Sequence, residues 1–316
     1  MLSEKANAIC LLELLKEFSD TEHILPMREL LSKMQAIYGT KPDRRTVYGA
    51  VALLIELGFD ISTYEDNGTG YYLRSRDLEQ AEILLLTDAV YSFPFIPAKQ
   101  TEQLVQKLQK QLSIHQRKHY RHLTIARQER KTGNRQVFWN IEQLDEAITR
   151  RKKVQLIYLH YGLDKKQHET NTYTLTPYEM VYMNEHYYLV CVPDHDPHTR
   201  LYRIDRMKDI RLLEEPRSET AARKQDVRDA IYAFVGAPER IVLYCDHMVL
   251  DDVIDRFGTA IQIRPRDDKT FVASFSAPPR GIKFWALQFL SHVEVAEPVW
   301  LREEIAESIR HNPYQV

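Results

Sequence analysis

Residues 173–213 read YTLTPYEMVYMNEHYYLVCVPDHDPHTRLYRIDRMKDIRLL, and this stretch indicates how the middle of the chain folds. Two apolar runs rich in tyrosine, Tyr178–Tyr182 and Tyr187–Val192, are separated by the polar pair Asn184-Glu185. Tyrosine and valine favour strands, and a polar break between two such runs favours a turn. We therefore predict two antiparallel strands joined by a short connection.

The segment Leu201–Arg206 follows after a short loop and alternates apolar with charged residues. Alternate side chains of a strand point to opposite faces, so Arg203 and Asp205 are expected on one face and Arg206 on the other, unless a bulge intervenes. A strand with two arginines beside tyrosine-rich strands would form a surface that can bind an anion and stack a base.

Three elements of this stretch occur in a fixed order. Pro177 comes first, the tripeptide Tyr187-Tyr188-Leu189 second, and the hexapeptide Tyr202–Met207 third. In kind and spacing they resemble the WYL domain of bacterial transcriptional regulators, with Tyr187 in place of the usual Trp. The resemblance implies a small Sm-like β-barrel of four or five strands after one helix, over residues 139–215. It also implies a pocket that receives nucleotides or nucleic-acid fragments.

The resemblance assigns an effector-binding set to this domain. Guanidinium groups suit phosphate because they donate two parallel hydrogen bonds, and tyrosine rings stack on bases. The alternative role for Arg203 and Arg206 is structural, by pairing with Asp205 or a neighbouring carboxylate. Strand alternation lets only one of the two adjacent tyrosines face the pocket. The predicted effector-binding residues are Tyr158, His186, Tyr187, Tyr188, Arg203 and Arg206.

Residues 1–75 carry three apolar repeats of helical spacing and then a hairpin pattern. The buried faces are predicted at Leu11, Leu14, Leu15 and Phe18, then Leu30, Met34 and Ile37, then Val47, Ala50, Val51 and Leu54. Pro26 suits the first turn of the second helix, and Asp43 is the expected N-cap of the third. The turn Asp66–Gly70 between two short apolar segments predicts a wing, so the fold expected here is a winged helix-turn-helix.

The third of these helices is the predicted DNA-contacting element. The segments Asp43–Tyr48 and Leu57–Ile61 resemble the recognition helix and first wing strand that precede WYL domains. The predicted DNA-binding residues are Arg44, Arg45, Thr46 and Tyr48. Gly49-Ala50 stands where the family has an Arg-Asp pair, and residues 1–75 hold eight Lys/Arg against eleven Asp/Glu, a net charge of −3. A winged fold used for protein contacts is therefore the alternative.

Residues 76–138 are expected to form a helical connector. Asp77 is a candidate cap for a helix through Val90, and leucines at helical spacing predict a second helix beyond Pro97. From Lys107 to Arg135 there are nine Lys/Arg and one acid, Glu129. This basic segment is either a phosphate-contacting patch or a solvated helix face.

The last third of the chain begins with a polar linker over residues 216–238. Residues 239–316 then predict strand, helix, strand, strand, helix, strand and a final helix, which is the order of a ferredoxin-like fold. The segments Phe284–Leu290, Val293–Val295 and Pro298–Arg302 resemble the C-terminal extension that follows WYL domains. The fold class expected for the whole chain is thus a multidomain α+β protein.

Several classes of function lack their sequence signals. The three cysteines are far apart and show no zinc-ligand spacing, so we expect neither a disulfide framework nor a metal site. There is no signal-peptide pattern, no apolar run long enough for a bilayer, and no motif of a nucleotide-cradling loop, zinc protease or serine hydrolase. Residues 194–198 (DHDPH) suit a surface turn better than a metal site.

These observations predict a cytoplasmic, non-enzymatic transcriptional regulator without a cofactor. Its expected partners are double-stranded DNA, an anionic effector (a nucleotide or single-stranded nucleic acid) and a second copy in a homodimer. The alternative is a non-transcriptional nucleic-acid-binding or accessory module that uses the basic segment and the barrel. The net charge of −2 is uninformative, so any nucleic-acid surface must be local.

Overall fold

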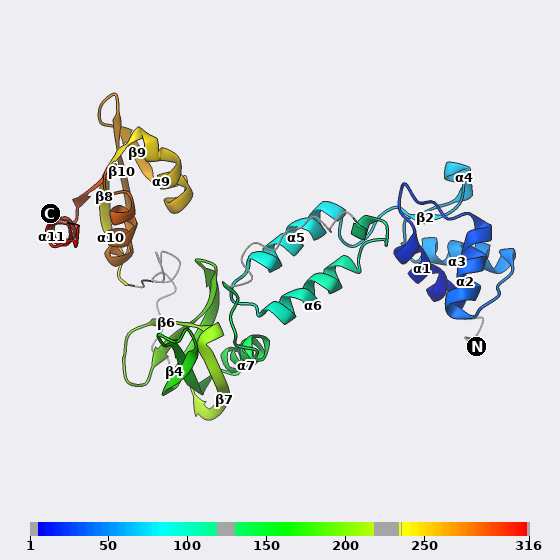
Figure 1. Ribbon diagram of the computed structural model, residues 1–316, viewed down its shortest axis with the longest axis horizontal. Coiled ribbons are helices and arrows are strands. Elements are labelled where there is room, and N and C mark those ends of the chain that lie inside the picture. Colours follow the sequence, from blue (N-terminus) through cyan, green and yellow to red (C-terminus); the bar gives the residue numbers. More distant parts are fainter. Residues whose placement is uncertain (1–5, 119–129, 218–233, 235, 315–316) are drawn as a thin grey trace. The chain divides into compact units, whose positions relative to one another are not determined.

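The computed structural model describes residues 6–118, 130–217, 234 and 236–314 of the 316-residue chain. It divides into two compact units, residues 1–132 and 133–316 (Figure 1). Helices and antiparallel sheets are present in both units, which makes this a mixed α+β protein. None of the helices within the described ranges combines the length and apolar character that a bilayer span requires.

Three helices and a small sheet form the start of the first unit: α1 (Asn7–Phe18), α2 (Met27–Tyr38), α3 (Arg44–Glu56), β1 (Ile61–Ser62) and β2 (Tyr72–Leu73). Asp43 caps α3 as predicted, since its carboxylate accepts a hydrogen bond from the Thr46 amide at 2.7 Å. The four residues predicted for the inner face of α3 are all buried, and so are the predicted leucines of α1. Ile37 is 48% exposed, so that prediction is wrong: Leu30 and Met34 alone carry the buried stripe of α2.

The connection between β1 and β2 is not the tight turn that the sequence predicts. One helical turn, α4 (Tyr64–Asn67), occupies part of it, because Thr63 and Asp66 form a capping box. The side-chain oxygen of Asn67 then accepts hydrogen bonds from the amides of Thr69 and Gly70, at 2.8 and 2.9 Å. Local side-chain bonds therefore replace strand pairing, and each strand is only two residues long.

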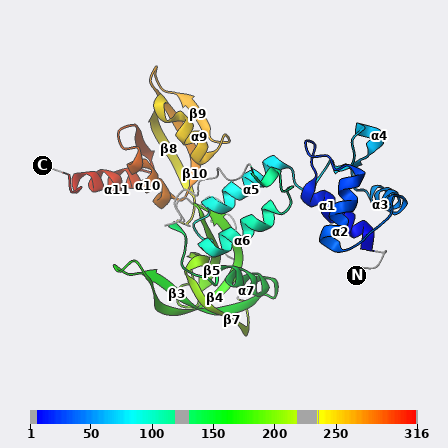
Figure 2. The ribbon, with the colours of Figure 1, turned by 45° about the vertical axis from the view of Figure 1, so that its right-hand side comes forward.

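A helical pair follows within the same unit, with α5 (Gln80–Ser92) and α6 (Ala98–Gln109) lying side by side (Figures 1 and 2). Its small apolar core is built on Ile83 and Leu112. The prediction that Asp77 caps this helix is wrong. Glu79 caps α5 instead, in a capping box with Glu82.

The second unit begins with α7 (Val137–Thr149) and a five-stranded antiparallel sheet. The strands are β3 (Lys152–Tyr161), β4 (Gln167–Met183), β5 (His186–Pro193), β6 (Arg200–Arg203) and β7 (Met207–Pro216). Their order is β6-β5-β4-β3-β7. Leu144 and Ala147 of α7 share one buried cluster with the inward residues of the sheet, so α7 covers one face (Figure 2). Asn184 and Glu185 have φ of 48° and 62°, which confirms a tight hairpin turn between β4 and β5.

Two predictions for this sheet are wrong. The barrel is not closed, because the described residues of the edge strands β6 and β7 do not pair with each other. The strand predicted through Arg206 ends at Arg203, and residues Ile204–Arg206 form a 3-10 turn. This turn separates β6 from β7. Arg206 therefore does not lie in a strand, and strand alternation does not determine which way its side chain points.

A second sheet carries the last third of the chain. It contains β8 (Glu239–Asp246), β9 (Gln262–Pro265), β10 (Thr270–Ala277) and β11 (Val293–Glu297), in the order β11-β8-β10-β9, all antiparallel. The helices are α9 (Leu250–Phe257), α10 (Pro279–Gln288) and α11 (Val299–Arg310). All seven elements occur in the order that the sequence predicted. Residues from the three helices and the sheet share one core that includes Trp285 and Phe271.

Gly70 marks a close approach of two backbones. A Cβ atom built there would lie 2.2 Å from the carbonyl oxygen of Leu25, because the β-bridge between Leu25 and Tyr71 brings these two segments of the backbone together. We expect Gly70→Ala to lower the free energy of unfolding of this domain by about 1–3 kcal/mol, measured by urea denaturation. The matched control is Gly49→Ala on α3, where nothing lies within 4 Å; it should be stabilising by about 0.5–1 kcal/mol. Equal effects of the two substitutions would contradict this packing.

Candidate functional site

The first turn of α3 presents the predicted DNA-binding residues to solvent. Arg44, Arg45 and Thr46 are exposed, and Tyr48 is 53% exposed. The opposite face of the helix is fixed by Val47, which is buried. All four predicted residues are thus accessible to solvent at the start of α3.

Among its described residues, the salt bridges of this domain leave Arg44 and Arg45 unpaired, whereas two of its acidic residues are paired. Arg44 and Arg45 form no salt bridge with any described residue, so their guanidinium groups are available to a ligand. Among the acids, Asp60 and Asp66 are both engaged by Arg74, with nitrogen–oxygen distances of 3.4 and 2.8 Å. A locally basic helix end can therefore exist in a domain with a net charge of −3.

A second candidate site lies on β5, β6 and the 3-10 turn. Tyr188 is directly opposite Arg203 in the antiparallel register, so both side chains lie on the same face of the sheet. Tyr188 is only 8% exposed, and burial raises the pKa of its hydroxyl. His186 is two residues away on the same face and contacts the Tyr188 ring edge-on.

Arg203 is held by a buried carboxylate. Its Nε and one terminal nitrogen donate to the two oxygens of Asp205, at 3.0 and 2.7 Å, and Asp205 is 1% exposed. Burial alone would lower the pKa of Arg203, but the hydrogen bonds and charge of Asp205 outweigh burial and raise it. Two guanidinium nitrogens of Arg203 are therefore already engaged by Asp205. This agrees with the alternative that Arg203 has a structural role and pairs with Asp205.

Two other polar groups of this cluster have no such partner. His186 Nδ1 and Arg206 Nε are buried and lack a hydrogen bond to any described residue. Burial, together with the nearby charge of Arg203, lowers the pKa of His186, so its imidazole is neutral at neutral pH. The guanidinium of Arg206 lies over the Tyr161 ring at 5.6 Å. Buried polar groups are almost always satisfied, so these two atoms mark a position where a ligand could bind.

The other two predicted residues differ in how they lie relative to this cluster. Tyr187 lies on the opposite face of β5, packed against the core beneath α7. Tyr158 is 7% exposed, and its hydroxyl accepts a hydrogen bond from the Arg203 amide at 3.2 Å. Tyr158 is thus placed to hold the backbone of Arg203, whereas its ring belongs to the core.

Two buried asparagines hold the 3-10 turn, and the sequence analysis missed both. Asn134 Nδ2 donates to the carbonyl oxygens of Asp205 and Met207, at 3.0 and 2.7 Å. Asn140 Nδ2 donates to those of Ile204 and Met207, at 3.2 and 2.7 Å. A single sequence offers no signal for these bonds, because each joins residues more than sixty positions apart.

The basic segment is only partly a free surface. Arg117 binds both oxygens of Glu17, at 2.8 and 2.5 Å, and donates to backbone carbonyls. Lys131 donates to the carbonyl oxygens of Val90 and Phe93, and burial lowers its pKa to about 8. Arg117 therefore links the segment after α6 to α1, and Lys131 is bonded to the end of α5. Arg121, Arg127 and Glu129 lie outside the described residues.

The loop 194–198 is a turn stabilised by ion pairs. Asp196 accepts from His198 Nδ1 at 2.7 Å and from Arg200 Nε at 2.6 Å, while Asp194 pairs with Lys153. The described part of the chain contains no group of three or more His, Cys, Asp or Glu side chains arranged to hold a metal ion.

Comparison with protein families assigns the second unit. Residues 140–212 match the WYL domain, and residues 237–311 match the WCX domain. The first match covers α7 and the five-stranded sheet, and the second covers the four-stranded sheet and its helices. The second unit therefore contains a WYL domain followed by a WCX domain.

Two solved structures are similar to this chain at low identity. One is the proteasome accessory factor B/C (PafBC) of Arthrobacter aurescens, at 15% identity and a TM-score of 0.29, with 98% of this chain and 48% of that chain covered. The chain thus spans about half the length of that protein. The other is a CRISPR Cas-related protein, at 15% identity and a TM-score of 0.38, with coverages of 97% and 82%. The comparison with curated proteins gave no match.

The Arg203–Asp205 pair yields a prediction for stability. Arg203→Ala would leave the carboxylate of Asp205 buried without its cation, so we expect a loss of about 3–5 kcal/mol of unfolding free energy in urea denaturation. The double variant Arg203→Ala/Asp205→Ala should lose less, because it removes both charges. Arg211→Ala, at an exposed position of β7, is the control and should change stability by less than about 0.5 kcal/mol. A loss for Arg203→Ala as small as that of the control would show that the pair is unimportant.

Proposed function

We propose that this protein is a DNA-binding transcriptional regulator whose WYL domain senses an anionic effector, either a nucleotide or single-stranded nucleic acid. The observation that carries the proposal is the exposed, basic first turn of α3, free of salt bridges to described residues, in a chain that also contains a WYL domain. Neither feature alone would suffice, since three-helix domains also bind proteins.

Residues 6–75 act in this proposal as a winged helix-turn-helix. The first turn of α3 enters the major groove, where an arginine can donate two hydrogen bonds to guanine and Thr46 can reach a phosphate or base edge. The hairpin β1–β2 is the wing. The protein works as a homodimer and reads a site with two-fold symmetry, with the ferredoxin-like WCX domain assisting dimerisation or closing over the effector.

The effector site of the proposal is the cluster around the 3-10 turn. Arg206 and His186 offer buried nitrogen atoms, and Tyr188 offers a flat ring beside them. An anion bonded to Arg206 would gain a charge-assisted hydrogen bond in a site largely shielded from water. The effector regulates only if it binds the DNA-competent and incompetent states with different affinity.

The alternative, an accessory nucleic-acid-binding module built on the basic segment, has less support. Arg117 and Lys131 belong to the basic segment, but both are engaged in contacts within the first unit. A patch without these two cations would release fewer counterions on binding.

The DNA-binding proposal is tested by selecting duplex sites from a random library with the purified full-length protein. We expect a specific, two-fold symmetric site. Arg44→Ala/Arg45→Ala should weaken binding to it by about 1–3 kcal/mol for each lost base contact. The control Arg264→Ala/Lys269→Ala makes the same charge change at exposed positions of the WCX domain and should keep wild-type affinity. Equal losses in both variants would remove α3 from the interface.

The effector proposal is tested by calorimetry with short single-stranded oligonucleotides and cyclic dinucleotides. Arg206→Ala should lose at least tenfold in affinity for whichever probe binds, because its guanidinium supplies the unoccupied donor. Arg211→Ala carries the same charge change on exposed β7 and should bind normally. Duplex binding without effector should be unchanged in both. Wild-type probe affinity in Arg206→Ala would contradict this site.

A further inference from the structure

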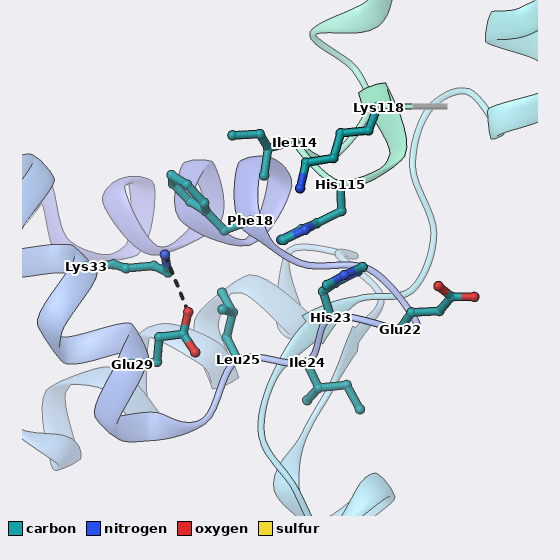
Figure 3. Close-up of a pocket in the computed structure, with 10 residues that line it drawn as sticks. All are labelled: Phe18, Glu22, His23, Ile24, Leu25, Glu29, Lys33, Ile114, His115 and Lys118. Atoms are coloured by element: carbon teal, nitrogen blue, oxygen red, sulfur yellow. Dashed lines mark ion pairs between the residues drawn. The ribbon is translucent and has the colours of Figure 1, made fainter. Parts of the chain in front are cut away.

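A cavity of about 500 Å³ lies within the first unit and takes no part in the function proposed above. Its walls come from the end of α1, the turn that leads into α2, α2 itself and the segment after α6 (Figure 3). Phe18, Ile24, Leu25 and Ile114 give it apolar surface. The remaining lining residues are Glu22, His23, Glu29, Lys33, His115 and Lys118.

Two stacked imidazoles form part of this wall. The rings of His23 and His115 are 3.6 Å apart between centroids and 7° from parallel. Asp20 fixes the first ring, since His23 Nδ1 lies 2.7 Å from its carboxylate, which also accepts from Ser113 at 2.6 Å. Burial, and then the neighbouring His23, lower the pKa of His115. At neutral pH the stack therefore contributes a flat surface to the cavity and no extra charge from His115.

The cations of the cavity differ in how they are engaged. Lys33 pairs with Glu29 at 3.4 Å and lies over the Phe18 ring at 4.3 Å. Lys118 forms no salt bridge with any described residue, and its ammonium group points toward the space beside His115 (Figure 3). The carboxylate of Glu22 points away from that space (Figure 3). Lys118 is thus an exposed lysine that has no ion pair with any described residue and lies next to apolar walls.

The charge balance limits the class of ligand. Two lysines and two glutamates line the cavity, so the formal charges of these four side chains cancel. A dianion such as phosphate would meet one free ammonium, with the Glu29 carboxylate as the nearby negative charge. A monoanion with an apolar body would place its charge at Lys118 and its body against Phe18 and Leu25.

We propose that this cavity binds a small carboxylate with an apolar body, with the Lys118 ammonium as the anchor of the carboxylate. The site joins the α1–α2 turn to the segment after α6, two parts already linked by Ser113–Asp20 and Arg117–Glu17. A bound ligand would therefore stabilise the unit in proportion to its occupancy.

Phenylacetate is the probe, added to the full-length protein in calorimetry and in thermal unfolding. We expect binding in the millimolar range or tighter, with a concentration-dependent rise in Tm. Acetate, which has the charge without the ring, and benzyl alcohol, which has the ring without the charge, should each bind at least tenfold more weakly. Failure of phenylacetate to bind at about 10 mM, or equally tight binding of acetate or inorganic phosphate, would overturn the proposal.

Two variants locate the site. Lys118→Ala should weaken phenylacetate binding roughly tenfold, the effect of one charge-assisted hydrogen bond. Ile114→Glu, at a position that is 40% exposed, should abolish binding by placing a carboxylate in the cavity. The control is Lys107→Ala, which removes an exposed lysine of α6 outside the cavity and should bind as the wild type does. Wild-type affinity in Lys118→Ala would assign the binding to another site and refute this one.

Discussion

The buried ion pair between Arg203 and Asp205 determines how the WYL domain presents its candidate site. Asp205 is 1% exposed, and a carboxylate at that depth is tolerated only with a cation and hydrogen bonds around it. The pair lies where β6 gives way to the 3-10 turn, so it joins the last residue of the strand to the turn itself. The direction of Arg206 depends on that turn.

The backbone of the turn is fixed from two further sides. Asn134 and Asn140 donate hydrogen bonds to its carbonyl oxygens, and the Tyr158 hydroxyl accepts a hydrogen bond from the Arg203 amide. Such a network holds one backbone geometry, because each buried group that loses its partner costs about 1–3 kcal/mol. Arg203, the residue that most resembles an anion binder in the sequence, thus holds the turn, while Arg206 Nε and His186 Nδ1 have no hydrogen-bond partner among the described residues.

The first unit uses the same kind of polar linkage. Asp20, in the turn between α1 and α2, accepts bonds from His23 and from Ser113, and Arg117 reaches Glu17 from the segment after α6. Arg117, one cation of the basic run, is therefore engaged at this joint and is not a free surface charge. The charge of a segment therefore says little about its ligands until the partners of each side chain are known.

The sequence by itself determined the helices, most strands and the exposed face of α3, because apolar spacing and capping residues act over a few positions. It also placed Tyr188, His186 and the two arginines in one segment that resembles a WYL domain. Only the tertiary structure decided that Arg203 is occupied, that Tyr187 faces the core, that the sheet is open, and that Asn134 and Asn140 hold the turn. Each of these features depends on contacts between residues distant in the chain or on a local break in strand geometry. The periodicity of a single sequence carries no information about such contacts or breaks.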